Sequence, residues 1–138
     1  MAGDFLHKDP ARPLRVALVY PRLWHQVRSF LPPLGLVSLA TVARAAGHQV
    51  RLFDPSFDRT PRRLQEQLRE FGPEVVGLSV SSDLYPLAQD ICAFARGLGA
   101  RTVMGGPHAT ICAEEVLAQT PDLDIVMAGE GENTFPAL

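Results

Sequence analysis

The sequence is poor in cysteine, has little excess charge and lacks any long apolar segment. Its 138 residues include two cysteines, Cys92 and Cys112, with no C-x-x-C pair. This pattern excludes a disulfide scaffold and a zinc knuckle, and two reduced thiols are typical of a cytosolic protein. The net charge of -2 leaves no basic stripe for nucleic acid or for an anionic membrane. No apolar run approaches the roughly 20 residues of a membrane helix, so we expect a cytoplasmic protein.

The usual nucleotide-binding motifs are also missing. Residues 21–33, which follow the first apolar run, contain neither G-x-G-x-x-G nor G-x-x-x-x-G-K-[ST], which argues against NAD, FAD or ATP bound in their usual modes. A receiver domain needs clustered aspartates at the ends of its first and third strands. Tyr20 and Val80–Ser81 stand there instead, so that class is set aside.

What the chain does contain is a regular alternation of short apolar runs and segments with helical periodicity. After a polar arm, residues 1–13, one domain is expected over residues 14–138. The helix that follows the second run should have Thr60 as its N-cap and Pro61 as its first residue. The expected strands are 15–20, 49–53, 75–80, 101–104 and 124–128; the expected helices are 34–46, 61–71, 83–96 and 114–119, with the first turn of a truncated last helix from Asn133.

These five continuous apolar strands, each followed by a helix, predict an α/β fold with a mainly parallel, doubly wound five-stranded sheet. Ligands of such sheets bind beyond the carboxyl ends of the strands. The loops that matter are therefore 21–33, 54–59, 81–85, 105–110 and 129–133.

Several residues in these loops are candidates for ligand binding, and each also has a purely structural interpretation. Ser79, Ser81 and Ser82 can bond a ligand or satisfy nearby backbone. Gly105-Gly106 permits close approach of a flat ligand or simply makes a tight turn. His108 and the segment Gly129-Glu130-Gly131-Glu132 add polar groups at the same edge. His25, in the first loop beside Trp24, is a candidate metal ligand by its place alone, and Met104 and Met127 are expected in the core.

The ordered set of motifs at these strand ends resembles a known family. It comprises Pro32-Pro33-Leu34-Gly35-Leu36, then Gly47-His48 and Asp54, then Val76-Gly77-Leu78-Ser79, then Gly105-Gly106-Pro107-His108-Ala109-Thr110, and finally Gly129-Glu130-Gly131-Glu132-x-Thr134. Over residues 14–138 this order is similar to the amino-terminal cobalamin-binding domain of cobalamin-dependent radical S-adenosylmethionine enzymes.

The resemblance implies a flavodoxin-like sheet of order 2-1-3-4-5, with a corrin ring across the carboxyl edge. The nucleotide tail would lie beside the sheet with its base off cobalt, next to Ser79 and Ser81. Gly105-Gly106 would make room for the tail, while Pro107-His108 and Gly129–Glu132 would lie near the ring. The parent enzyme would be of the methyltransferase type.

Two features limit what the resemblance can imply. His25 lies outside any D-x-H-x-x-G motif, so no histidine ligand to cobalt is expected from it. The C-x-x-x-C-x-x-C cluster for a 4Fe-4S centre is absent, so this centre and S-adenosylmethionine would belong to a downstream domain, and this chain alone is not expected to be catalytic. The alternatives are a flavin- or nucleotide-binding domain and a cofactor-free domain for protein interaction.

Overall fold

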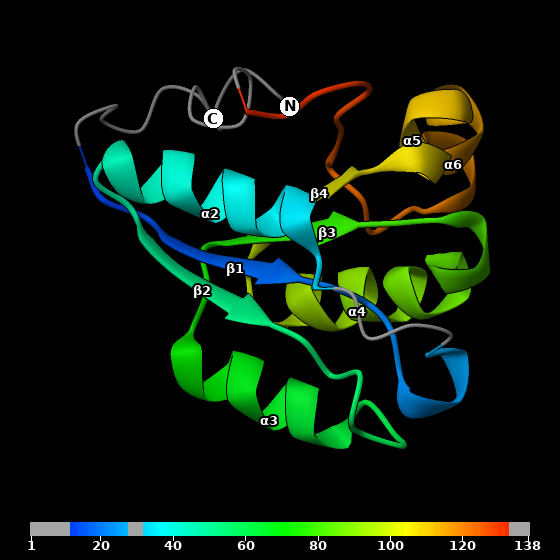
Figure 1. The fold of residues 1–138 in the computed structure, drawn as a ribbon, viewed down its shortest axis with the longest axis horizontal. Coiled ribbons are helices and arrows are strands. Elements are labelled where there is room, and N and C mark those ends of the chain that lie inside the picture. The colour runs from blue at the N-terminus through cyan, green and yellow to red at the C-terminus, as the bar shows by residue number, and fades with distance from the viewer. Residues whose placement is uncertain (1–11, 28–31, 133–138) are drawn as a thin grey trace.

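The computed structural model describes residues 12–27 and 32–132 as five strands and their connecting helices (Figure 1). The strands are β1 (Arg15–Val19), β2 (Gln49–Phe53), β3 (Val75–Ser79), β4 (Arg101–Gly105) and β5 (Ile125–Val126). The helices are α2 (Leu34–Ala45), α3 (Arg62–Phe71), α4 (Tyr85–Gly97), α5 (Pro107–Ile111) and α6 (Ala113–Gln119), with short 3-10 turns η1 (Trp24–Gln26) and η2 (Ser82–Leu84).

The strands form one all-parallel sheet in the order β2-β1-β3-β4-β5. This confirms the predicted fold class and strand order. The chain leaves β1 toward β2 but leaves β3 toward β4, so the order reverses between β1 and β3. The carboxyl ends of these two strands are therefore the topological switch point, where open α/β sheets bind their ligands.

Helices cover both faces of the sheet, as expected for a doubly wound fold (Figure 1). On one face α3 and α4 pack against side chains such as Ala17, Val76 and Met104, and α5 and α6 join the same core. On the other face α2 packs through Leu36, Ala40 and Ala43. Because strand side chains alternate between faces, each strand contributes to both cores.

Several expectations differ from the structure in detail. Thr60 is not the N-cap of α3: Pro61 holds that position, no side chain caps it, and the helix begins at Arg62. Residues 107–111, expected as loop, form the short helix α5, which Pro107 can begin because the first helical residue needs no N–H partner. β5 is limited to Ile125–Val126, and Tyr20 lies just beyond β1. The predicted helix from Asn133 and the arm up to residue 11 lie outside the described residues.

Candidate functional site

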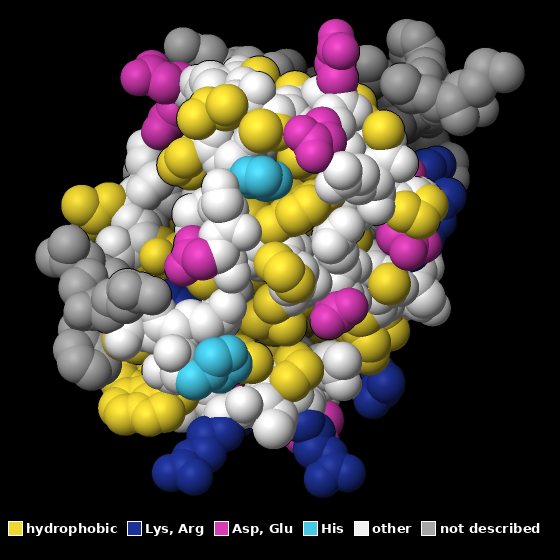
Figure 2. Space-filling model, turned by 90° about the vertical axis from the view of Figure 1, so that its right-hand side faces the viewer, with side chains coloured by type: hydrophobic (Ala, Val, Ile, Leu, Met, Phe, Trp, Pro, Cys, Tyr) yellow, Lys and Arg dark blue, Asp and Glu magenta, His cyan; other side chains and the backbone are white. Residues whose placement is uncertain are grey.

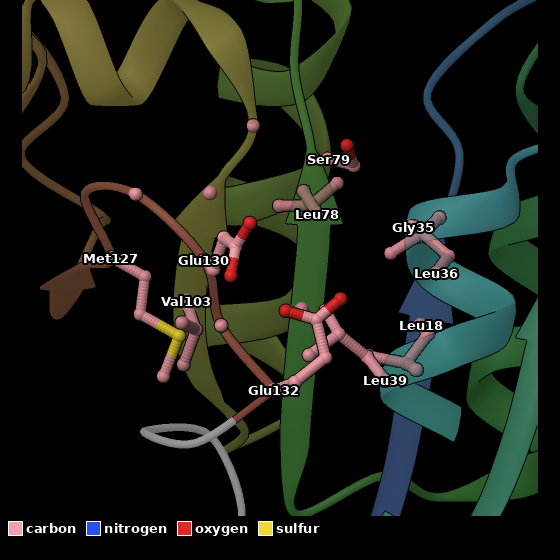
Figure 3. Close-up of a pocket in the computed structure, with 15 residues that line it drawn as sticks. Leu18, Gly35, Leu36, Leu39, Leu78, Ser79, Val103, Met127, Glu130 and Glu132 are labelled. Carbon is pink, nitrogen blue, oxygen red and sulfur yellow. The ribbon is translucent and has the colours of Figure 1, made fainter. Parts of the chain in front are cut away.

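A pocket of about 210 Å³ opens on the α2 side of the sheet, at the carboxyl ends of the central strands (Figure 3). Its floor is the sheet, one wall is α2, and the opposite wall is residues 127–132, which follow β5. The pocket therefore lies at the switch point of the strand order. That volume can take a small planar group, but a macrocycle would have to lie outside it.

The floor of the pocket is built from small residues. Gly77 and Ser79 of β3 and Gly105 of β4 line it, and Ser79 pairs directly with Gly105 in the register of the two strands. Leu18 and Val103 complete the apolar part of the floor. Small residues side by side on neighbouring strands leave a depression in which a flat group can approach the backbone.

The α2 wall is shaped by a glycine and two leucines. A Cβ added at Gly35 would meet no atom within 4 Å, so this glycine leaves open space at the start of the helix. Leu36 and Leu39 of the same helix supply apolar contact surface (Figure 3).

The opposite wall, residues 127–132, is held at two points. The Gly129 N–H donates to Thr110 Oγ1 of α5 at 3.0 Å. A Cβ added at Gly131 would lie 3.1 Å from Leu39 Cδ2 and 3.5 Å from Met127 Sδ, so a larger residue there would have to displace the Leu39 side chain slightly. The segment thus joins the β4 side of the carboxyl edge to α2 and forms one wall of the pocket.

Two carboxylates give the pocket its charge. The side chains of Glu130 and Glu132 point into the space between α2 and the 127–132 segment (Figure 3). Neither forms an ion pair with a described residue. Carboxylates accept hydrogen bonds and repel anions, so the pocket suits a neutral group that carries donors and suits a free phosphate poorly.

The two glycines at the end of β4, Gly105 and Gly106, differ in why a side chain is disfavoured at each position. Gly106 has φ +92, and a Cβ there would lie 2.7 Å from the Val80 backbone nitrogen, so the backbone itself requires glycine. A Cβ at Gly105 would lie 3.6 Å from the Met127 carbonyl oxygen, an ordinary contact inside the pocket. Only Gly105 therefore leaves room that a ligand could use.

Three of the predicted residues do not line the pocket but closely follow lining residues at the strand ends, a position that is called the rim below. The lining includes Ser79, Gly105, Gly106 and Gly129–Glu132, but it omits Ser81, Pro107 and His108. The Ser81 hydroxyl donates to Asp83 at 2.6 Å. His108 is bonded to Ser82 through Nδ1 at 3.0 Å.

The loops after β1 and β2 are joined to each other on the far side of the carboxyl edge. The Trp24 N–H donates to the Asp58 carbonyl at 2.9 Å, and the buried Arg22 donates from Nε to Ser56 at 3.0 Å. His25 lies in this region, in η1, and does not line the pocket. Within residues 12–27 and 32–132 no group of three or more His, Cys, Asp or Glu side chains could hold a metal ion.

The carboxyl edge as a whole presents apolar side chains with polar groups around them (Figure 2). In this view hydrophobic side chains run through the middle of the face, with histidine and acidic side chains among and around them, and with arginine or lysine at the lower and right-hand edges. Such a face can carry a large flat ligand above the pocket.

Several pocket residues were not identified from the sequence. They are Leu18, Gly35, Leu36, Leu39, Gly77, Leu78, Val103 and Met127. Gly35 and Gly77 carried a usable signal, because a glycine early in a helix or inside a strand often marks close approach of a ligand or of other backbone. The apolar residues carried none, because a pocket leucine has the same pattern as a core leucine. Met127 is buried, as expected, but it forms part of the pocket wall.

Comparison with known proteins agrees with this geometry. An uncharacterized methyltransferase of Pyrococcus horikoshii is 30% identical over 132 residues, which cover 91% of this chain and 28% of that protein. The anaerobic magnesium-protoporphyrin IX monomethyl ester cyclase of Synechocystis sp. is 31% identical over 113 residues, which cover 78% of this chain and 23% of that protein. The hopanoid C-3 methylase of Methylococcus capsulatus is 33% identical over 124 residues, which cover 86% of this chain and 24% of that protein.

A solved structure shares the fold. It is that of OxsB, a cobalamin-dependent S-adenosylmethionine radical enzyme with aqua-cobalamin and S-adenosylmethionine bound. It superposes with a TM-score of 0.75 at 20% identity over 91% of this chain and 18% of that one. The chain thus spans less than a third of the length of each of these proteins.

The family model of the B12 binding domain matches residues 23–138, a range that includes every residue of the pocket except Leu18. The chain therefore belongs to the B12-binding domain family.

Proposed function

We propose that residues 14–138 carry a cobalamin whose corrin ring lies across the carboxyl edge and whose nucleotide tail enters the pocket beside α2. The pocket supports this proposal: it lies at the switch point, has a floor of small residues and is too small for the ring itself. A tail placed there keeps its base away from cobalt, which corresponds to the base-off form.

The residues present fit such a tail. Ser79 offers a hydroxyl at the floor, Gly105 leaves room beside it, and Glu130 and Glu132 can accept hydrogen bonds from ribose hydroxyls or from the amides of the corrin. Of the residues outside the pocket lining, Ser81 is proposed to lie beside the tail, and Pro107 and His108 near the ring. His25 stays a candidate cobalt ligand by position only, since it lies in η1 and not among the pocket residues.

Bound cobalamin would supply the chemistry, the making and breaking of a bond between cobalt and carbon. The chain's own part would be to bind and orient the cofactor and to exclude water from one side of it. The apolar side chains in the middle of the carboxyl edge and the pocket beside α2 would serve these tasks (Figure 2).

The parent activity is proposed from the relatives. The matched region makes up between 18% and 28% of the length of those relatives, which include a methyltransferase, a methylase and a cyclase. We propose that further chain supplies a radical domain with a 4Fe-4S centre and S-adenosylmethionine, and that the whole enzyme transfers a methyl group to an unreactive carbon or performs a related radical reaction.

A cytoplasmic location is part of the same proposal. Both cysteines are free, as expected in a reducing compartment. No helix within the described residues is long and apolar enough to cross a membrane.

A thermal-shift comparison of this chain with hydroxocobalamin and with FMN tests the cofactor. A ligand present at a hundred times its Kd should stabilise the folded state by about 2.7 kcal/mol. We expect cobalamin to raise Tm and FMN to leave it unchanged, because FMN would bring a phosphate against Glu130 and Glu132. A shift with FMN alone would favour a flavin-binding domain, and no shift with either would favour a cofactor-free interaction domain.

A further inference from the structure

His108 lies at the rim of the pocket, between two residues that help to form it. Gly106, two residues earlier, lines the pocket. Thr110, two residues later, accepts the hydrogen bond from the Gly129 N–H that holds the 127–132 wall. The backbone N–H of His108 donates to the Val80 carbonyl at 3.0 Å, which fixes the start of α5 to the end of β3.

The His108 ring is held in one orientation. Its Nδ1 lies 3.0 Å from Ser82 Oγ. The ring rests on Tyr85 with centroids 4.6 Å apart. Tyr85 is in turn fixed by a 2.6 Å hydrogen bond between its hydroxyl and Thr120 Oγ1 in the protein interior. The other ring nitrogen, Nε2, makes no hydrogen bond to a described residue.

The charges around this histidine make it distinctive. Within residues 80–84, 105–111 and 127–132, the strand-end segments on the pocket side of the carboxyl edge, there are three carboxylates, Asp83, Glu130 and Glu132, and no arginine or lysine. His108 is therefore the one side chain of these segments that can carry positive charge or donate from a ring N–H. An anionic part of a ligand passing this rim has few other partners there.

The chemistry of the cofactor supplies such an anionic part. Cobalamin's nucleotide tail contains a phosphodiester between its ribose and the arm that leads to the corrin. With the base in the pocket and the ring across the carboxyl edge, the phosphodiester has to pass the rim.

We propose that His108 binds this phosphodiester by donating a hydrogen bond from Nε2. The inference rests on the proposed function. With the Ser82 hydroxyl donating to Nδ1, a neutral His108 ring carries its proton on Nε2, ready to donate. The contact would offset the repulsion between the phosphodiester and the three carboxylates, and it would select corrinoids that carry a complete nucleotide tail.

Two corrinoids test this assignment with the whole chain. Hydroxocobalamin carries the phosphodiester, and cobinamide has the same ring without the nucleotide. We expect His108→Ala to weaken hydroxocobalamin binding about tenfold and to leave the Kd of cobinamide unchanged. His108→Gln should retain most of the affinity, because its side-chain amide can donate from nearly the same place as Nε2.

His48→Gln is the matched control. His48 lies at the opposite end of the sheet, where its Nδ1 accepts a hydrogen bond from the Leu14 N–H at 3.1 Å, so neither Kd should change. A thermal melt of each variant checks that it is folded. Equal losses for both corrinoids, or no loss for either, would overturn the assignment to the phosphodiester. An unaltered chain that binds neither corrinoid would contradict the proposed function itself.

Discussion

At the residue scale, the two glycines at the end of β4 should behave differently when they are replaced. Gly105→Leu should weaken cobalamin binding by more than tenfold, because its side chain would occupy the pocket beside Met127. Ser79→Ala removes one hydrogen bond, worth about 0.5–1.5 kcal/mol, and should weaken binding about two- to tenfold. Affinity is measured by titration with hydroxocobalamin. Gly97→Ala, with no atom within 4 Å of the added Cβ, is the control. Equal or reversed effects would count against the placement of the tail.

Gly106→Ala should instead lower the free energy of unfolding of the ligand-free protein. Its backbone conformation, φ +92 with ψ -176, is one that side-chain-bearing residues rarely adopt, at a cost of about 1–3 kcal/mol. The close approach of a Cβ to the Val80 nitrogen adds to this cost. Urea unfolding of the ligand-free chain measures the change. A variant as stable as the unaltered chain would show that the turn can rearrange.

The two thiols should differ in reactivity. Burial, together with the nearby charges of Asp122 and Asp124, raises the pKa of Cys92 to about 12. At neutral pH this thiol is protonated and shielded, whereas Cys112 is half-buried. A disulfide reagent should therefore label one thiol in the native chain and two in denaturant. Rapid labelling of both thiols in the native chain would mean that α4 opens readily.

At the scale of elements, the contact between α2 and the 127–132 segment should control the affinity of the pocket for cobalamin. Gly131→Ala would press its Cβ on Leu39 at 3.1 Å and should weaken cobalamin binding. Leu39→Ala in the same chain removes the obstruction and should restore part of the affinity. We expect a coupling energy of about 0.5–3 kcal/mol between the two changes in a double-mutant cycle of Kd values. Strictly additive effects would mean that the two residues do not meet.

The short pairing of β4 with β5 depends on a buried threonine. Thr102 donates from Oγ1 to the Asp122 carbonyl at 2.7 Å and accepts from the Asp124 N–H at 3.0 Å. Thr102→Val would leave the Asp122 carbonyl without this donor and the Asp124 N–H with only its 3.3 Å bond to the Thr102 carbonyl, and should lower the free energy of unfolding by about 1–3 kcal/mol. Thr41→Val, on the exposed side of α2, should change it by no more than about 0.5 kcal/mol. Comparable losses for the two variants would show that β5 is held by other contacts.

Most of the elements could be predicted from the sequence because their signals are local. The strand over 49–53 has the predicted bounds, and Gly47 and Gly72, with φ +95 and +63, follow the ends of α2 and α3 as expected. α5 could not be predicted, because its five residues are too few to show a helical period. β5 is shorter than its apolar run, since only Ile125 and Val126 pair with β4.

The site was predictable only where glycine and serine mark strand ends. Seven of the ten residues proposed for the cofactor line the pocket, because the carboxyl ends of parallel strands meet at one edge. The α2 wall was not predicted, since nothing in residues 34–39 distinguishes a leucine that faces a pocket from one that faces the core. The bond between Ser82 and His108 spans 26 positions and follows only from the way the start of α5 lies beside the chain that leaves β3.

At the scale of the whole molecule, the chain is a domain of the B12-binding family whose pocket and carboxyl edge together suit a tailed corrinoid. The most direct test is a visible spectrum of the purified chain after incubation with hydroxocobalamin and desalting. We expect a retained corrin band, in the position of the base-off form, at one equivalent per chain. A colourless protein after desalting would contradict cobalamin binding by this chain.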